Sequence, residues 1–496
     1  MPLPKPRVPN RLLRDRDLQV VCGLVLAGVA LRLAFMSGIR PIVYGLNDSG
    51  TYMAAANGYG FFFDVHHATG YSMFLSLVSP VVQTGVGLAV LQHAMGLAGG
   101  VLLYYAGRAF GGPRWAAAVC AGAYLLSIDI VALEHSILSE ALFLPLVCVV
   151  VFAAARLYRA ERSRSILLFA ALLGAASAIS YTARYTGGAL FMAAPLLALA
   201  LPSATIRTRL LSATTTAAVV VAIVGSYVVA QDRALGIGLS PFPGHGWNKY
   251  TALAPGADCS RFTPPPGTRV LCESATQRAG KSPEFYSWDP ASPARRLEAR
   301  GFPYSDAKFS AFADAVEAGA KSGSQTSQDP GFLDRLLGIP DNVGGWLTST
   351  TRHAGTVYGS ASYFADLRYQ SLVVEANERV LAAGLLELPP MTFHAPIQPL
   401  QDLRPFMRVT GPTALIALLI AFIALPRMGR RRAAFCVTMM LVMLAWTIAG
   451  QLPRYSIPTF VLSLSLLPVA ASTFQRGREP SEGGKPEFQP NVSTPR

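Results

Sequence analysis

The residues of this chain that could carry chemistry are gathered in a few short polar stretches between long apolar runs. They are, in chain order, Asp48, Tyr52, Asp64, His66 and His67, then Glu134, His135 and Glu140, and finally Arg184 and Arg454. Charged groups next to apolar segments are costly and are usually paired or functional. Carboxylates serve as general bases, and arginine binds phosphate with a planar fork of donors. The set therefore suits a reaction on an anionic, lipid-linked substrate.

Each carboxylate in this set also has a structural interpretation that the sequence leaves open. Asp48 lies in Asn-Asp-Ser-Gly, a strong turn and N-cap signal, and would cap a helix that starts near Thr51. Glu140 in LSEALF would be stabilised at the N-terminus of a helix by the helix dipole. Glu134, with the neighbouring His135, also fits an ordinary solvated loop.

The arginines and the paired histidines have alternatives of the same kind. Arg184 and Arg454 stand at the ends of apolar runs, where arginine often anchors a span by reaching the membrane interface. His66 and His67 look like a metal site, yet adjacent residues seldom both ligate one ion. A catalytic role and an anchoring or capping role therefore both remain open for these residues.

The composition shows what must hold these stretches in place. Hydrophobic residues make up 52% of the 496 residues and charged residues only 14%, with a mean hydropathy of +0.38. So few charges cannot cover several soluble domains, because an average soluble chain is about 25% charged. The net charge of +14 sits in short clusters between apolar runs rather than on a basic face with interleaved aromatics, so we expect no nucleic-acid partner. The sequence predicts an all-α polytopic membrane protein.

Apolar stretches of about twenty residues, the length that crosses a hydrocarbon core, predict about ten transmembrane helices. The predicted spans are 18–36, 85–107, 115–133, 140–158, 166–183, 185–201, 210–230, 409–426, 433–450 and 455–474. The stretch 71–82 is too short to cross and predicts a helix lying at the interface. The first apolar run lacks a convincing cleavage site, so we expect a retained span.

Clusters of Lys and Arg orient the predicted spans. They occur before the first span and at 108–114, 156–164, 207–209, 427–432 and 476–478, all on one side if ten spans alternate. Since short basic loops stay in the cytoplasm, both termini are expected there, in a protein of the cell membrane. The polar stretches that could carry chemistry then lie on the extracytoplasmic face.

The chain divides into four predicted parts. Residues 1–230 form a first transmembrane module of seven spans, 231–408 an extracytoplasmic domain between spans seven and eight, 409–475 a second module of three spans, and 476–496 a disordered tail. The extracytoplasmic domain is rich in turn signals, with helical stretches at 306–320 and 370–385. It contains Cys259 and Cys272, which an oxidising compartment would join as a disulfide.

The order of these features resembles the GT-C class of integral membrane glycosyltransferases, in particular the branch related to dolichyl-phosphate-mannose protein mannosyltransferases and bacterial lipid-carrier-dependent glycosyltransferases. The matching features are D-x-x-x-Y from Asp48 to Tyr52, HATGY at 67–71, Glu140 in LSEALF, Arg184 in YTARY, and Arg454-Tyr455 ahead of Pro458. The segment ALAPGADCSRFTPPPGTRVLCE also looks like one in bacterial members. Many relatives have two acidic residues together in the first loop, whereas here Asn47 precedes Asp48. The resemblance therefore leaves the metal requirement and the acceptor class open.

The resemblance implies a reaction and a role for each residue. The donor would be a polyprenyl-phosphate sugar, with the acceptor a glycan, lipid or protein on the extracytoplasmic side. The implied roles are Asp48 as general base, Glu140 and Glu134 orienting the substrates, Arg184 and Arg454 binding the phosphate, and Tyr52, Tyr455 and His135 contacting substrate. His66 and His67 would help to hold an optional divalent metal ion, and no other cofactor is expected. Aromatic residues of the extracytoplasmic domain, Trp247, Tyr250 and Trp288, would grip the acceptor or would simply form the core of the domain.

Other functions fit parts of the same pattern. A transporter or flippase would show matching interrupted spans in two halves, but seven spans precede the insert and three follow it. A ligase for lipid-linked glycans would share the phosphate-binding residues and transfer a whole glycan. A structural subunit would tolerate loss of Asp48. The sequence favours a glycosyltransferase of cell-envelope glycan assembly.

Overall fold

The structure is a computed structural model that describes residues 15–44, 47–62, 66–241, 243–281, 283–299, 301–322, 385–394, 410–449 and 456–476. Three predicted site residues, Asp64, Arg454 and Tyr455, lie outside these ranges, as do nearly all of the predicted helix at 370–385 and nearly all of the predicted tail.

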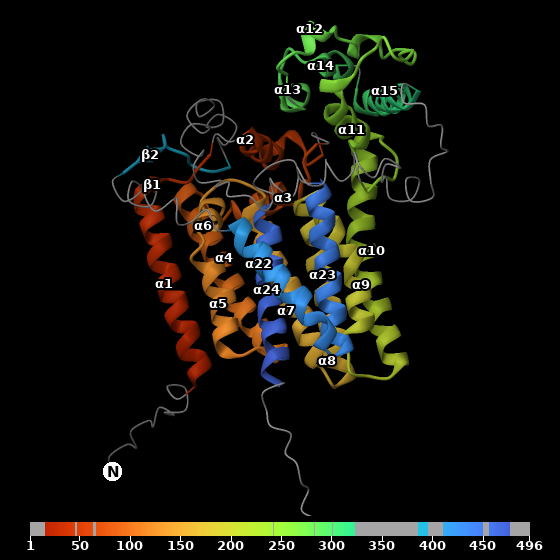
Figure 1. The fold of residues 1–496 in the computed structure, drawn as a ribbon. Helices are drawn as coiled ribbons and strands as arrows, with labels where there is room; N and C mark the ends of the chain where they lie inside the picture. Colours follow the sequence, from red (N-terminus) through yellow and green to blue (C-terminus); the bar gives the residue numbers. More distant parts are fainter. Residues whose placement is uncertain are drawn as a thin grey trace, which may run out of the picture.

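Long helices packed side by side form the body of the protein (Figure 1). They are α1 (Arg16–Gly38), α4 (Gly85–Ala109), α5 (Arg114–Leu125), α6 (Ile128–Glu134), α7 (Glu140–Arg159), α8 (Ser163–Ala183), α9 (Gly188–Ala200), α10 (Ile206–Leu235), α22 (Thr410–Ala424), α23 (Arg430–Ala449) and α24 (Ser456–Arg476). Within the described residues, six are long and apolar enough to cross a membrane: α1, α4, α7, α8, α10 and α24. The pair α5 and α6, bent by 50°, would make a seventh span, and shorter apolar helices cover 185–200 and 413–427. The predicted polytopic helical membrane fold is thus confirmed in its coarse form.

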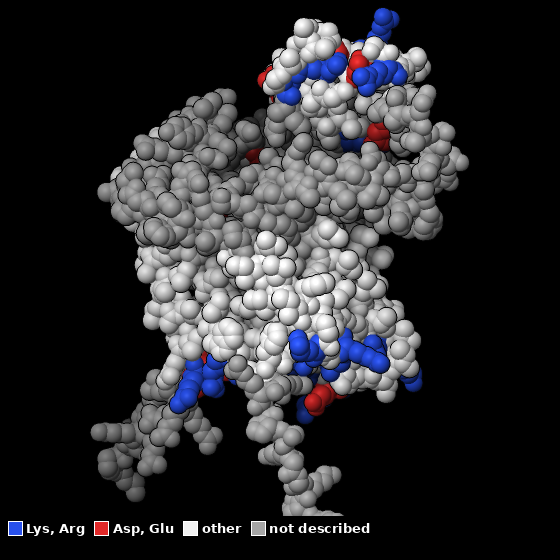
Figure 2. All heavy atoms as spheres, viewed as in Figure 1, with Lys and Arg blue, Asp and Glu red and all other residues white. Residues whose placement is uncertain are grey.

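The outer surface of these helices is apolar, as a lipid-facing surface should be. Leu26, Leu168, Val221 and Phe422 are each at least 65% exposed. In a soluble protein such residues would be packed inside or would form an interaction surface. Figure 2 shows Lys and Arg gathered at the end of the bundle where α1 begins, with uncharged surface beyond them. This distribution matches a membrane-embedded body with one basic end.

Short elements cover the opposite end of the bundle. Here lie β1 (Ile39–Arg40), α2 (Asn47–Ala54), the π-helical turn Ala55–Tyr59, α3 (Gly70–Val78) and β2 (Thr392–Phe393). The two strands pair antiparallel, with Ile39 opposite Phe393. The helix α3 corresponds to the predicted interfacial helix, and it ends before Pro80. These elements connect the ends of the spans and carry most of the candidate site.

Beyond α10 stands a small helical domain (Figure 1). It consists of α11 (His245–Leu253), α12 (Ala275–Arg278), α13 (Pro283–Trp288), α14 (Pro293–Glu298) and α15 (Phe302–Ser322), which matches the helix predicted at 306–320, with short 3-10 turns at Ala254–Gly256 and Arg269–Leu271. Cys259 and Cys272 are joined, with an S–S distance of 2.04 Å.

The aromatic residues of this domain make its core. Tyr250 is fully buried and Trp247 is 5% exposed, and they pack in one cluster with Tyr286, Phe309 and Phe312. The expectation that Trp247 and Tyr250 form a sugar-gripping surface is therefore wrong for this structure, because a ring with no exposed face cannot stack on a sugar.

Candidate active site

Asp48 and Tyr52 lie on one face of α2. The helix begins at Asn47, so Asp48 lies inside its first turn and does not cap a helix that starts near Thr51. A carboxylate in this position is favoured by the positive end of the helix dipole. Asp48 is 7% exposed and Tyr52, one turn further on, is 4% exposed.

His67, from the loop before α3, contacts both residues of α2. Its Nε2 lies 3.3 Å from Oδ1 of Asp48. Its ring meets the ring of Tyr52 edge to face, with the centroids 5.7 Å apart. The Asp48 carboxylate is thereby held between α2 and the loop.

Glu140 and Arg184 form a buried ion pair beside this group. Glu140 is the first residue of α7, and Arg184 directly follows α8. The Arg184 Nη1 lies 2.6 Å from Glu140 Oε1, and the two side chains are 9% and 1% exposed. Burial of both charges makes each dependent on the other, since an unpaired charge at this depth would be strongly unfavourable.

The hydroxyl of Ser139 joins the two halves of the site. It accepts hydrogen bonds from the Tyr52 hydroxyl at 3.0 Å and from Arg184 Nη1 at 2.9 Å. Its own proton points to Glu140 Oε2 at 3.4 Å. Ser139 was not predicted as a site residue, although it directly precedes Glu140 in LSEALF and this position indicates that the two lie together. Four predicted site residues, Asp48, Tyr52, Glu140 and Arg184, thus lie in one connected group.

Tyr52 stays protonated in this environment. Burial, followed by the charge of Asp48, raises the pKa of the Tyr52 phenol well above its ordinary value, and Arg184 only partly offsets this. The phenol is therefore a fixed hydrogen-bond donor rather than a proton acceptor.

A glycine brings the His67 loop against the helix end that carries Arg184. A Cβ placed at Gly70 would lie 2.6 Å from the backbone carbonyl group of Thr182, two residues before Arg184. Only glycine allows this approach of two backbones. Next to it is a small cavity lined by Thr51, Tyr52, Ala55, Phe61, His67, Ala68, Thr69 and Ser72. The close contact fixes the distance between the acidic and the basic parts of the site.

Glu134 and His135 lie in a separate buried network. Both oxygens of Glu134 are bound by Arg32, from Nε and Nη2, at 2.8 Å each. His93 Nδ1 lies 3.0 Å from Glu134 Oε2, and His93 Nε2 lies 3.0 Å from His135 Nδ1. His135 Nε2 in turn reaches the carbonyl oxygen of Ile39 at 3.0 Å. The structure therefore does not bring Glu134 and His135 together with Asp48.

This second network is closed to solvent. Arg32 and His93 are 2% and 3% exposed, and Glu134 and His135 are fully buried. Burial, followed by His93, lowers the pKa of His135 to about 3, so His135 is neutral. Arg32 lies within a long apolar run, and its place in this network was not predicted from the sequence.

Gln92 and Tyr71 connect the second network to the first. Gln92 Nε2 donates to the carbonyl oxygens of Glu134 and Ser136, at 2.9 and 3.2 Å. Its Oε1 accepts from the Tyr71 hydroxyl at 2.6 Å, and the Tyr71 ring meets Tyr52 edge to face at 5.2 Å. The buried network thus reaches Tyr52 of the site through Gln92 and Tyr71.

The two adjacent histidines point to different partners. While His67 contacts Asp48, the His66 Nε2 lies 3.6 Å from Glu298 Oε1 of α14. The His66 ring also packs on Trp247 of α11, with the centroids 4.1 Å apart. Within the described residues, no group of three or more His, Cys, Asp or Glu side chains has an arrangement that could hold a metal ion. His66 instead links the first loop to the small helical domain.

Comparison with known proteins gives structural neighbours only. No protein-family model and no curated protein matches the sequence. The fold is similar to that of an oligosaccharyltransferase from Archaeoglobus fulgidus in the apo form, at 13% identity over 93% of this chain and 51% of that one, with a TM-score of 0.45. It is also similar to the archaeal oligosaccharyltransferase AglB from Archaeoglobus fulgidus in complex with an inhibitory peptide and a dolichol-phosphate, at 13% identity over 96% and 53%, with a TM-score of 0.42. The chain spans about half the length of these neighbours.

Proposed function

We propose that this chain is a membrane glycosyltransferase that moves a sugar from a polyprenyl-phosphate donor to an extracytoplasmic acceptor, in cell-envelope glycan assembly. One observation carries the proposal. At one end of an apolar helical bundle, a buried Arg184–Glu140 pair is hydrogen-bonded through Ser139 to Tyr52, beside the Asp48–His67 pair. A phosphate-binding group and a candidate base thus lie next to each other at the end of candidate membrane spans.

The proposed topology has ten spans. The six long apolar helices and the bent pair α5 and α6 are joined by α9, α22 and α23. With the basic end of the bundle in the cytoplasm, both termini are cytoplasmic, and the site and the small helical domain lie outside. The proposed boundaries of the parts remain 1–230, 231–408, 409–475 and 476–496.

Arg184 is proposed to bind the phosphate of the donor. Its guanidinium is held at the end of α8 by Glu140 and Ser139. A planar guanidinium has five donors, so the phosphate would join or replace Glu140 as its partner. Fixed positive charge at the phosphate stabilises the negative charge that builds up as this group leaves. Arg454 and Tyr455 are proposed as further ligands of the same phosphate.

Asp48 is proposed as the general base. An acceptor hydroxyl oxygen would attack the anomeric carbon while the bond from that carbon to the phosphate oxygen breaks. The hydroxyl proton passes to the Asp48 carboxylate, and polyprenyl phosphate leaves with the bonding electrons. A single displacement of this kind inverts the anomeric carbon. His67 orients the carboxylate, and Tyr52 donates a hydrogen bond within the same group.

The other predicted residues take supporting roles in this proposal. Glu140 holds Arg184 in place and is proposed to orient the sugar or the acceptor. Glu134 and His135 act as positioning residues, because their polar atoms are already bound within the buried network. The proposed steps use only this chain's own side chains.

The test compares the wild type with Asp48→Asn in lipid nanodiscs, using a panel of polyprenyl-phosphate sugars. General bases contribute about 10²- to 10⁴-fold to a rate. We expect sugar transfer or donor hydrolysis to fall by that factor in the variant while donor binding is retained. Asp314→Asn is the matched control, since Asp314 is 63% exposed and pairs with Lys249 on the surface of the small domain.

Two outcomes contradict the proposal. If Asp48→Asn turns over as fast as the wild type, Asp48 is structural. If neither protein consumes any donor although lipid phosphate binds, the protein carries lipid-linked glycans or assists their assembly.

A further inference from the structure

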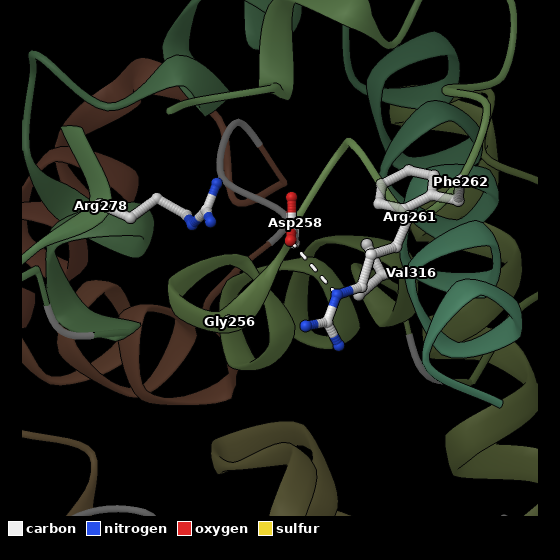
Figure 3. Close-up of a pocket in the computed structure, with 6 residues that line it drawn as sticks. All are labelled: Gly256, Asp258, Arg261, Phe262, Arg278 and Val316. Atoms are coloured by element: carbon white, nitrogen blue, oxygen red, sulfur yellow. Dashed lines mark ion pairs between the residues drawn. The ribbon is translucent and has the colours of Figure 1, made fainter. Parts of the chain in front are cut away.

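The small helical domain contains an open cavity of about 310 Å³, a size within the range of small-molecule sites. The residues that line it are Gly256, Asp258, Arg261, Phe262, Arg278 and Val316 (Figure 3). They come from the 3-10 turn Ala254–Gly256, the loop that follows it, the end of α12 and one face of α15. The cavity is separate from the Asp48–Arg184 site and shares no residue with it.

Two arginines and one aspartate give the cavity its charge. Arg261 Nε lies 3.3 Å from Asp258 Oδ2, and Arg278 points towards Asp258 from the other wall (Figure 3). The backbone N–H and the hydroxyl of Ser260 hold the other oxygen of Asp258, at 3.1 and 2.7 Å. These hydrogen bonds, followed by the charge of Arg261, lower the pKa of Asp258, so the carboxylate is ionised. The described residues that line the cavity therefore carry one positive charge in excess.

A neighbouring acidic group does not cancel this excess. Arg278 donates to the backbone carbonyl of Glu273, while the Glu273 carboxylate is bound by Lys281 Nζ at 2.6 Å and by the Tyr286 hydroxyl at 2.7 Å. The carboxylate of Glu273 is thus paired with Lys281. The backbone carbonyl of Glu273 holds the guanidinium of Arg278 in place.

The frame of the cavity is rigid. The disulfide of Cys259 joins the loop of Asp258 and Arg261 to Cys272, ahead of α12. On the other side, the Phe262 ring packs on Phe312 with the centroids 5.5 Å apart. A Cβ at Gly319 of α15 would lie 2.9 Å from Phe262 Cβ, so the helix lies directly against the loop. A rigid frame lowers the cost of ordering the site on binding.

We infer that this cavity binds a sugar unit that carries one acidic group, a carboxylate or a phosphate. The excess positive charge and the forked donors of the arginines suit a single anionic group. The ionised Asp258 accepts hydrogen bonds from sugar hydroxyls and repels a second acid, which disfavours polyanions and acidic peptides. The ring of Phe262 and the side chain of Val316 give an apolar wall for the face of the sugar ring.

This inference rests on the proposed function and names the class of its acceptor. The acceptor would be an acidic glycan that the small domain holds while a hydroxyl of the glycan reacts at Asp48. Binding at this cavity can be measured without turnover. The protein with Asp48→Asn should still bind the acidic sugar, so failure of the transferase proposal and failure of this inference are distinguishable.

The experiment measures binding calorimetrically to the full chain in nanodiscs. The probes are a trisaccharide with a terminal hexuronate, its methyl ester, the same trisaccharide with a terminal sugar phosphate, and an acidic tripeptide. We expect the hexuronate or the phosphate form to bind, and the ester to bind about tenfold more weakly, the loss typical of a charge-assisted hydrogen bond. The acidic probe that binds more tightly shows whether the anionic group of the ligand is a carboxylate or a phosphate.

Three variants locate the binding. Arg278→Gln should weaken binding of the acidic probe about tenfold. Arg296→Gln makes an equal change of charge at an exposed residue of α14 outside the cavity and should leave this binding unchanged. Gly256→Phe should abolish binding by filling the cavity. No atom lies within 4 Å of a Cβ placed at Gly256, and its φ is not positive, so this variant should fold.

The inference is overturned if ester and acid bind equally, if Arg278→Gln and Gly256→Phe bind like the wild type, or if the tripeptide binds more tightly than either acidic sugar.

Discussion

Removing the carboxylate of Glu134 should destabilise the protein far more than removing the Arg32–Glu134 pair as a whole. In Glu134→Leu, Arg32 keeps its bonds to the carbonyl oxygens of Gly28 and Leu125, at 3.1 and 2.9 Å. It loses both bonds to the carboxylate. The guanidinium is then a buried cation without a counter-charge.

The structure sets the magnitude. Arg32 and Glu134 have side-chain exposures of 3% and 0%, and breaking a buried pair by removing one partner costs about 3–5 kcal/mol. In the double variant Arg32→Met/Glu134→Leu no charge is left unpaired. The remaining losses are the partner of His93 Nδ1 and the Arg32 donor to the Leu125 carbonyl oxygen, each of which costs about 1–3 kcal/mol. We therefore expect the double variant to be more stable than the single variant Glu134→Leu by about 2 kcal/mol. Both lose the partner of His93, and an unpaired buried charge costs more than an unpaired carbonyl.

The assay is equilibrium unfolding in mixed micelles, followed by tryptophan fluorescence, for the wild type, both single variants and the double variant. Sugar transfer is measured on the same samples. The prediction is contradicted if Glu134→Leu is as stable as the wild type. It is also contradicted if the losses of unfolding free energy in the two single variants simply add up to that of the double variant. If the double variant is stable but transfers no sugar while donor binding persists, Glu134 takes part in the reaction and is not only a positioning residue.

Three further predictions follow from the site. Arg184→Gln removes the cation that pairs with Glu140 and the proposed phosphate ligand. The affinity for the donor, measured by calorimetry, should therefore fall at least tenfold. Unchanged donor affinity would show that the phosphate binds elsewhere. Gly70→Ala forces the His67 loop away from Thr182, so turnover should fall while the overall fold, judged by far-UV circular dichroism, is retained; full activity would show that the contact is not needed. Burial lowers the pKa of His135 from 6.5 to about 3, so between these values the unfolded chain binds a proton that the folded chain does not. Stability should then fall by about 1 kcal/mol per unit as the pH drops below about 6.5; an equal acid-induced drop in His135→Gln would assign it to another group.

The long helices of the body were predictable because each one is an apolar run of about twenty residues or more. The predicted spans 85–107 and 166–183 lie inside α4 and α8, with only small shifts at the ends. The span predicted at 115–133 was harder, because it is two helices bent by 50°. The break falls at Ser127, whose hydroxyl accepts from the N–H of Ile130 and so begins α6. Hydropathy averages over such a break and does not register it.

The pairings within the site were less predictable. Asp48, Glu140 and Arg184 are visible in the sequence because charge is rare in this chain, and the structure brings them into one group. Nothing in the sequence shows that Arg32 pairs with Glu134, because 102 positions separate them. Such a contact depends on how two helices cross, which a single sequence does not encode.

The two glutamates show why residue type alone does not assign function in this chain. Glu134 and Glu140 are six positions apart, and each binds an arginine. Glu134 binds its arginine deep in the bundle, at a place where a side chain on Gly96 of α4 would overlap the carboxylate. Its partner Arg32 is also held by two backbone carbonyls, so the pair is fixed on every side. Glu140 instead meets Arg184 at the end of two helices, in the group that contains Tyr52 and its cavity. The Arg184 side chain at the helix end is 9% exposed and that of Arg32 between the spans 3%. This difference supports the proposed roles of Glu140 in the reaction and of Glu134 as a positioning residue.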